Sequence, residues 1–435
     1  MSTFDQILTT IHAVLQQSAP NLHTIGELLI NRDLNGRVRL IALETVRSDP
    51  QAIQALKDIC AQLAERLGPH AWPVERAILF EDDLQQARSD APSFSLRDFP
   101  QVWVVDRLAT EGDWARISAK STGAPRIVFF SIKGGVGRST ALAATAWSLA
   151  QAGKRVLVLD LDLESPGLSS ALLPEDYRPA FGITDWLVED LVDNGAAILG
   201  EMVSISPLSH DGEIRVVPAH GSHPGEYINK LGRVWMPKVF ADGNREGWST
   251  RLSRLIAELE QSHRPDVILL DSRAGIDEVA SSCVTDLGAG LVLLFAIDGE
   301  QTWTGYRILF EHWQQYDVAP TIRERLKVVG AMLPDDERRT EYFDGLRERS
   351  HELFLEALYD EIPAGEIGEN CWTFDVDDIT GQHYPLPISW NRGFFALQSL
   401  HERMGSLDQR QVDHVFAELI QYISAFVQQK TRTDA

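Results

Sequence analysis

The sequence SIKGGVGRST, residues 131–140, has three glycines between an apolar run and a helical pattern. The apolar run, RIVFFS at residues 126–131, is typical of a buried strand, and the helical pattern covers Ser139–Ala152 before Gly153. Glycines at such a turn let backbone N–H groups approach an anion closely. The stretch therefore predicts a phosphate-binding loop at the carboxyl end of a strand.

Beyond this loop, apolar runs and helical patterns alternate along residues 123–435. Further strands are predicted at Arg155–Leu161, Ile214–Pro218, Asp266–Leu270, Leu291–Ile297 and Leu326–Met332, and further helices at Thr250–Gln261 and Gln409–Gln429. Continuous apolar strands separated by helices are typical of a sheet that is buried on both faces. We therefore expect an α/β fold with a mainly parallel sheet and helices on both faces.

Residues 1–122 are predicted to form a separate, small α/β domain. Helices are expected at Phe4–Gln17 and Asp49–Leu67, and strands at Val38–Leu43, Arg76–Phe80 and Val102–Val105. The segment AKSTGAP, residues 119–125, is small, polar and contains glycine and proline, so it is the predicted boundary. This domain carries no motif that indicates a chemistry.

Two further segments of the larger domain bring carboxylates to strand ends. DLDLESPGL begins at Asp160 and includes Asp162, and the apolar run DVILLD ends at Asp271. Because ligands of open α/β sheets bind at the carboxyl ends of the strands, we expect these side chains near the phosphate loop. Carboxylates and the Ser139 hydroxyl are suitable oxygen ligands for Mg²⁺.

Together, the three segments resemble the deviant Walker A ATPases of the ParA/MinD type, which are P-loop NTPases of the SIMIBI class with the loop KGGxGK[ST]. The resemblance covers most of residues 126–435 and implies that ATP and Mg²⁺ bind here. The implied nucleotide-binding residues are Lys133, Gly134, Gly135, Val136, Gly137, Arg138, Ser139 and Thr140.

The same resemblance implies a role for individual side chains. Asp162 would position the attacking water, and Lys133 would reach the nucleotide of the partner subunit in an ATP-dependent homodimer. Ser139, Asp160 and Asp271 would lie at the metal. Asp162 and Lys133 are thus the expected catalytic residues.

Arg138 departs from the family pattern, which has lysine at this position. Arginine keeps the charge and grips phosphate through two donors, but it is bulkier and planar. Binding should therefore survive this change more readily than fast hydrolysis. Arg273 lies in the segment SRAG, which matches switch II. The sequence leaves open whether it contacts phosphate or a neighbouring carboxylate, or forms a surface salt bridge.

No single residue in the sequence identifies which nucleotide base the site would bind. Leu333-Pro334 stands where many relatives have asparagine, and Leu386-Pro387 resembles the loop that packs against adenine. ATP is therefore expected from the resemblance.

Composition narrows the possible partners. The formal net charge is −23, and no cluster of lysine and arginine is visible, so neither a nucleic acid nor an anionic membrane is an expected partner. Three widely spaced cysteines without a CxxC pair favour a reducing, cytoplasmic setting. The most apolar stretch, Leu287–Ile297, is too short to span a bilayer.

Two functions follow as hypotheses. The first is a slow Mg²⁺-dependent ATPase that dimerises on ATP and whose residues 1–122 couple nucleotide state to a partner protein. The second is an ATP-binding scaffold or adaptor with little hydrolysis, in a multi-protein bacterial defence or positioning system. The biological process and the partner are not readable from the sequence.

Overall fold

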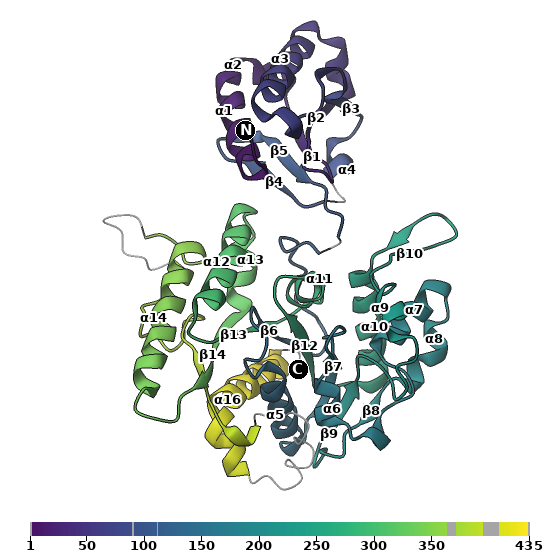
Figure 1. The fold of residues 1–435 in the computed structure, drawn as a ribbon, viewed down its shortest axis with the longest axis vertical. Coiled ribbons are helices and arrows are strands. Elements are labelled where there is room, and N and C mark those ends of the chain that lie inside the picture. Colours follow the sequence, from purple (N-terminus) through teal and green to yellow (C-terminus); the bar gives the residue numbers. More distant parts are fainter. Residues whose placement is uncertain (1, 89–90, 111, 363–370, 395–408, 434–435) are drawn as a thin grey trace. The chain divides into compact units, whose positions relative to one another are not determined.

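The computed structural model describes residues 2–88, 91–110, 112–362, 371–394 and 409–433. The chain divides into two compact units, one of Met1–Glu111 with Gln315–Asp317, and one of Gly112–Gln314 with Val318–Ala435. Figure 1 shows the elements of both units.

The segment 119–125, which the sequence suggests as a boundary, belongs to the second unit. The Ser121 N–H donates to the Gly288 carbonyl over 2.9 Å, and the Ser118 N–H donates to the Thr285 carbonyl over 2.8 Å. These bonds fix the segment against the larger unit, so the division between the units lies before it.

The first unit has a five-stranded sheet in the order β3-β2-β1-β5-β4. Its strands are β1 (Leu28–Arg32), β2 (Val38–Leu43), β3 (Ile78–Glu81), β4 (Ser93–Leu96) and β5 (Phe99–Asp106). Its helices are α1 (Ile7–Gln17), α2 (Ala19–Ile25), α3 (Pro50–Leu67) and α4 (Leu84–Arg88). This is the small α/β fold that the sequence predicts, with the strands β1 and β4 and the helices α2 and α4 in addition.

Side chains alternate across the strands of this sheet, so each strand serves two faces. Leu28 and Ile30 of β1 join the core that α1, α2 and α3 cover, whereas Leu29 belongs to a much smaller cluster with Leu84 of α4. Within the described residues, the face of this sheet opposite α1, α2 and α3 is therefore covered by α4, a helix of only five residues.

The second unit contains an eight-stranded sheet in the order β15-β14-β13-β6-β12-β7-β9-β8. Its strands are β6 (Arg126–Ser131), β7 (Arg155–Asp160), β8 (Ser204–Ile205), β9 (Glu213–Val217), β12 (Val267–Ala274), β13 (Leu291–Ala296), β14 (Leu326–Leu333) and β15 (Leu386–Ser389), and a separate ribbon pairs β10 (Lys238–Val239) with β11 (Arg245–Glu246). All pairings in the large sheet are parallel except that of β8 with β9. The predicted mainly parallel sheet is thus confirmed.

Helices cover both faces of the large sheet (Figure 1). The helices are α5 (Arg138–Gln151), α6 (Leu168–Leu172), α7 (Ile183–Glu189), α8 (Gly195–Ile198), α9 (Tyr227–Leu231), α10 (Trp248–His263), α11 (Glu278–Ser281), α12 (Glu300–Gln315), α13 (Ala319–Ile322), α14 (Arg339–Ala357) and α16 (Gln409–Thr433). Residues of α5, α6 and α16 form one core, and residues of α7, α10, α12 and α14 form the other. β6 is buried at every position because Ile127 and Phe129 enter the first core, whereas Val128 and Phe130 enter the second.

The centre of the large sheet gathers the motif-bearing strand ends. β6 lies between β13 and β12, and β7 lies on the other side of β12. The phosphate-loop sequence follows β6, and the two carboxylate motifs lie on β7 and β12. The fold thus brings the three segments to one edge, at the position where doubly wound sheets bind ligands.

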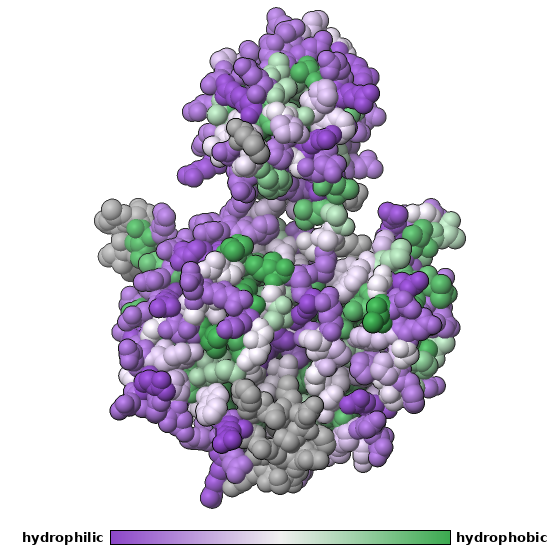
Figure 2. All heavy atoms as spheres, in the orientation of Figure 1, coloured by the Kyte–Doolittle hydropathy of each residue, from purple (hydrophilic) through white to green (hydrophobic). Residues whose placement is uncertain are grey.

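The outer surface is mainly hydrophilic in the view of Figure 2. Within the described residues, no helix is both long enough and apolar enough to cross a membrane.

Candidate phosphate site

The loop after β6 has the geometry of an anion-binding turn. Gly135 and Gly137 have φ angles of +75° and +82°, a region that residues with a side chain rarely adopt. Gly137 is the N-cap of α5, so the free N–H groups of the first helical turn begin directly after it. The helix begins at Arg138, one residue before the predicted start.

A cavity of about 510 Å³ lies beside this loop. Its wall includes Gly134–Thr140 from the loop, together with Asp162, Ser165 and Arg273 from the segments after β7 and in β12. All predicted loop residues except Lys133 thus line one cavity. Lys133 is exposed and is not among the described residues of the wall.

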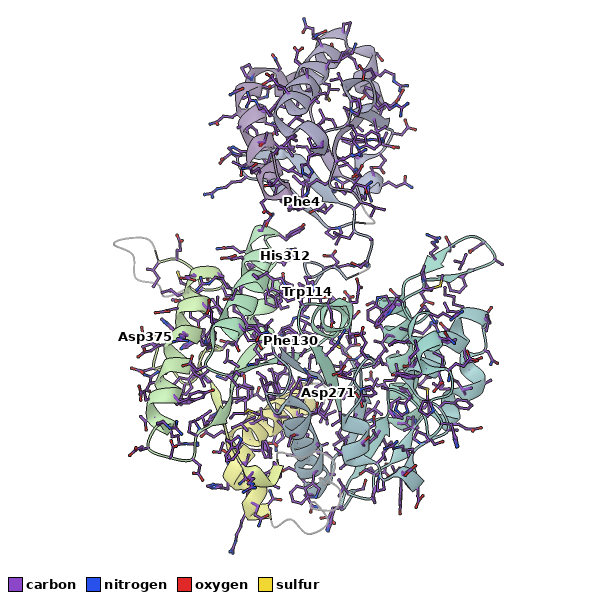
Figure 3. The ribbon with its side chains drawn as sticks, in the orientation of Figure 1. Phe4, Trp114, Phe130, Asp271, His312 and Asp375 are labelled. Atoms are coloured by element: carbon purple, nitrogen blue, oxygen red, sulfur yellow. The ribbon has the colours of Figure 1, made fainter. Side chains whose placement is uncertain are left out.

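Asp160 and Asp271 lie side by side because their strands pair in register. Asp271 of β12 is the direct parallel partner of Asp160 of β7, and neighbouring strands are only about 4.8 Å apart. Figure 3 labels Asp271 within the central part of the second unit. Both carboxylates are almost fully buried, with 0% and 1% of their surface exposed.

Burial and like charge change the protonation of this pair. Burial, and next the charge of Asp271, raise the pKa of Asp160 to about 7. Burial also raises the pKa of Asp271, although Arg138 and Ser139 act in the opposite direction. The pair thus concentrates negative charge that a cation can stabilise.

In the structure the cation beside these carboxylates is Arg138. Its Nε donates to Asp271 Oδ1 over 2.9 Å and its Nη1 donates to Ser131 Oγ over 3.0 Å, while Nη2 lies 3.7 Å from Asp162 Oδ2. Burial alone would lower the pKa of Arg138, but Asp271, Asp162 and Asp160 raise it. The guanidinium is therefore charged, and its donors are directed at carboxylates of the neighbouring strands.

Asp160 has one satisfied and one unsatisfied oxygen. Its Oδ2 accepts hydrogen bonds from the Ser169 N–H over 3.0 Å and from the Ser169 hydroxyl over 2.6 Å, whereas the buried Oδ1 has no partner among the described residues. An orphaned carboxylate oxygen next to a second carboxylate suits a hard cation such as Mg²⁺.

Protein side chains do not complete a metal site by themselves. Within the described residues, no group of three or more histidine, cysteine, aspartate or glutamate side chains is arranged to hold a metal ion. Mg²⁺ commonly takes one or two carboxylates and fills its remaining positions with phosphate and water oxygens. Asp160, Asp271 and the Ser139 hydroxyl fit such a partial set.

Asp162 is held differently from the buried pair. Its two oxygens accept from the N–H and the hydroxyl of Ser165, over 3.2 and 3.1 Å, and its side chain is 14% exposed. It therefore lies at the wall of the cavity, where a carboxylate can accept a hydrogen bond from a water molecule.

Arg273 lies near the end of β12 and links this strand to the segment that follows β7. Its Nη2 lies 2.6 Å from Glu164, and its Nη1 lies 3.3 Å from Asp277. Among the contacts that the sequence leaves open, the structure has the carboxylate pairs, and Arg273 also lines the cavity.

The remaining wall is formed by residues that the sequence analysis did not identify. Met332, with a positive φ of +57°, contributes from β14, and both β15 and the segment after it contribute further residues. The newly found wall residues are Met332, Ile388, Ser389, Trp390, Asn391, Phe394, Val415 and Phe416. Only the Leu386-Pro387 resemblance indicated this region. Its apolar and aromatic side chains suit the base of a nucleotide better than its phosphates.

Comparisons with known proteins find similarity over the segment that carries the loop and both carboxylate motifs. Residues 127–282 match the family model described as the CobQ/CobB/MinD/ParA nucleotide binding domain. A 53-residue stretch, 12% of this chain, is 47% identical to the putative arsenical pump-driving ATPase 1 of Aquifex aeolicus (strain VF5). That stretch spans only 13% of the pump ATPase.

Two solved structures are similar over a larger part of the chain. The septum site-determining protein MinD of Pyrococcus horikoshii OT3, complexed with Mg-ADP, is 19% identical, with 71% of this chain and 98% of that chain covered and a TM-score of 0.43. The pNOB8 ParA bound to nonspecific DNA is 17% identical, with 72% and 100% covered and a TM-score of 0.41. The expected absence of a nucleic-acid partner for this chain stays a prediction.

Proposed function

We propose that this chain is a Mg²⁺-dependent ATP switch, because residues 127–282 match the CobQ/CobB/MinD/ParA nucleotide binding domain model. In this proposal it dimerises around bound ATP, hydrolyses the nucleotide slowly and uses residues 1–122 to signal its state to a partner protein. The main support is a cavity that combines the glycine loop with Asp162. Arg138 of this loop also binds Asp271, the strand partner of Asp160.

The phosphates would lie on the loop, where Gly135 and Gly137 allow backbone N–H groups to point at an anion. Mg²⁺, when bound, neutralises charge on the phosphate oxygens. Asp160, Asp271 and Ser139 would hold it. Asp162 would orient the attacking water, since it is the carboxylate at the cavity wall that keeps partial access to solvent.

The contacts of Arg138 determine the expected rate of ATP hydrolysis. In its present contacts the guanidinium binds Asp271 and Ser131, and the same donors are needed to stabilise a phosphate. A contact with phosphate must therefore replace a charge-assisted contact of roughly 1.5–3 kcal/mol. This competition supports slow hydrolysis, and it is also the observation that favours the second candidate, an ATP-bound scaffold with little hydrolysis.

Arg138→Lys is expected to raise single-turnover ATP hydrolysis about tenfold, which corresponds to roughly 1.4 kcal/mol. A compact ammonium cannot reproduce both directed contacts to Asp271 and Ser131, so it is freer to reach phosphate. Binding should stay within about threefold, because the charge is kept. The measurement is radiolabelled phosphate release with enzyme in excess.

The matched control is Arg155→Lys, because Arg155 forms an exposed pair with Asp266 at the start of its strand. This control should leave turnover unchanged. An Arg138→Lys protein that loses both ATP binding and turnover contradicts the competition, and unmeasurable turnover in all three proteins favours the scaffold.

ATP-dependent dimerisation is expected to require Lys133. This side chain is exposed, and it lies outside the wall of its own chain's cavity, so it is available to a second subunit. In the Asp162→Ala background, which should keep ATP intact, ATP with Mg²⁺ should roughly double the mass measured by light scattering. Lys133→Ala should block this change.

Lys120→Ala is the control for this experiment, because Lys120 is another exposed lysine of the same unit. It should dimerise normally. A mass that ignores nucleotide in every variant, whether of a monomer or of a constant dimer, excludes the proposed switch.

A further inference from the structure

A second cavity, of about 680 Å³, lies within the first unit and shares no described wall residue with the cavity beside the glycine loop. Its floor includes Asn31 of β1 and Arg39 and Ile41 of β2, which point to the face of the sheet opposite α1, α2 and α3. Figure 1 shows α4 beside this sheet. Because α4 has only five residues, it leaves part of the face uncovered, and the cavity occupies that part.

Arg39 is the unusual side chain of this cavity. Its guanidinium lies 3.5 Å from the centre of the Trp72 ring, and its Nε is buried without a hydrogen-bond partner. Among the described residues, no carboxylate forms an ion pair with it. A half-buried arginine without an anionic partner is costly unless a ligand supplies one.

The Trp72 ring, over which the Arg39 guanidinium lies, is held in place by hydrogen bonds. The Trp72 backbone N–H donates to the Val38 carbonyl over 3.2 Å, and its indole Nε1 donates to Asp33 Oδ2 over 2.9 Å. Asp33 is in turn fixed by the backbone N–H groups of Asn35 and Arg37, both over 2.9 Å. The planar guanidinium is therefore oriented in advance, as bidentate recognition of a carboxylate or phosphate requires.

Carboxylates of opposite charge lie at the other end of the same cavity. Glu81 and Asp82 line it, are exposed, and form no ion pair within the part of the chain that the structure describes. In the β2–β3 pairing, Glu81 faces Leu43, four residues along β2 from Arg39. This corresponds to roughly 13 Å along the strands, which explains why the opposite charges do not neutralise each other.

The other polar groups of the cavity are already engaged. Arg107 donates to Asn31 Oδ1 over 3.0 Å and to the carbonyl of Ala87, which anchors α4 to the sheet. Asp83 accepts from the Gln85 N–H over 2.8 Å at the start of α4. Arg39 at one end and Glu81 with Asp82 at the other thus remain as the groups that a ligand can address.

We propose that this cavity binds a molecule with a carboxylate at one end and an amine or guanidine group at the other. A basic amino acid, either free or at the carboxyl terminus of a peptide, has this chemistry. Its carboxylate would bind the Arg39 guanidinium, and its basic side chain would lie between Glu81 and Asp82. The volume is in the range of small-molecule pockets, about 300–1,000 Å³.

The charges of the wall argue against a phosphate. Among the described residues of the wall there are four carboxylates, those of Asp33, Glu81, Asp82 and Asp83, and two guanidinium groups. A doubly charged anion would meet net repulsion, whereas a zwitterion satisfies both signs of charge. This contrast makes inorganic phosphate a discriminating probe.

The test is isothermal titration calorimetry of the full chain with L-lysine, L-arginine, the peptide acetyl-Gly-Gly-Lys, its carboxyl-terminal amide, and inorganic phosphate. Binding of the free amino acids identifies a small-molecule ligand, and binding of the peptide alone identifies a peptide end. In both cases the amide should bind at least tenfold more weakly, because it lacks the carboxylate.

The variant Arg39→Gln should weaken binding of the successful probe at least tenfold, and Glu81→Gln should weaken it about threefold. Arg37→Gln is the matched control, because Arg37 is exposed and lies 5.5 Å from the same Trp72 ring but does not line the cavity. Thermal unfolding of each variant, followed by circular dichroism, checks that the first unit is still folded.

Three results overturn the proposal. The first is that neither L-lysine, L-arginine nor acetyl-Gly-Gly-Lys binds, and the second is that binding is indifferent to Arg39→Gln. The third is that phosphate binds more tightly than the zwitterions. None of these outcomes bears on the nucleotide site, so failure here is separable from failure of the proposed ATP switch.

Discussion

Replacing Gly137 with valine is expected to weaken binding of a fluorescent ATP analogue at least 100-fold while the chain stays folded. Gly137 has a φ of +82° at the N-cap of α5, where a β-branched residue is strongly disfavoured. A Cβ at this position would meet no atom within 4 Å, so the valine causes no clash inside the protein. The loss therefore comes from a changed loop conformation, which turns N–H groups away from the phosphates.

Gly153→Val is a matched control for backbone strain. Gly153 follows the other end of α5, with a φ of +76° and likewise no atom within 4 Å of an added Cβ. Both variants should lose a similar amount of stability, about 1–2 kcal/mol, in thermal unfolding. Only Gly137→Val should lose the nucleotide. Equal affinity in Gly137→Val and the unmodified chain would remove the assignment of the phosphate site.

Replacing Asp162 with alanine is expected to lower single-turnover hydrolysis at least 100-fold and to change ATP binding by less than about threefold. Removal of a group that orients or deprotonates the attacking water typically costs 10²–10⁴ in rate. Binding should persist because the glycine loop, which would hold the phosphates, and the buried pair of Asp160 and Asp271 are unchanged in this variant. Phosphate release and nucleotide titration on the same preparations measure both quantities.

The variant Asp162→Asn separates a chemical role from a structural one. Asparagine has nearly the same size and can still accept hydrogen bonds from Ser165, which holds both oxygens of Asp162. A chemical role requires the charge, so the asparagine variant should be as slow as the alanine variant. Turnover restored by asparagine, or binding lost in parallel with turnover, contradicts the assignment to water.

The larger sheet was predictable because its signal is local. Strands such as β6 and β13 are apolar at nearly every position. This pattern is typical of strands that are buried on both faces. β12 continues to Ala274, four residues beyond its predicted end, because Asp271 and Ser272 are buried despite their polarity. Because the functional end of such a strand is polar, a search for apolar runs does not detect that end.

β1 was missed for a related reason. Its sequence, LLINR, ends in polar residues, yet Asn31 and Arg32 are both buried. Arg32 forms an ion pair with Asp106, which is 74 residues away along the chain. A contact between such distant residues leaves no trace in local periodicity, so the strand was not recognisable from the sequence.

The candidate site shows the same division between local and distant information. The loop glycines and the three aspartates were found because each lies in a short motif beside a strand. The wall formed by Met332, Trp390 and Phe416 depends on how three separate segments pack, and no motif marks them. The partner of Arg138 was equally hidden, because Asp271 lies 133 residues further along the chain.

The position of α16 has a consequence for the newly synthesised protein. Val415 and Phe416 complete the cavity wall, but they are translated about 270 residues after the loop that ends at Thr140. At synthesis rates of about 5–20 residues per second, roughly 15–55 s pass between the two events. A nascent chain thus exposes its glycine loop long before the pocket can close on a ligand. In the proposed switch, firm retention of a nucleotide should consequently begin only after α16 has been made.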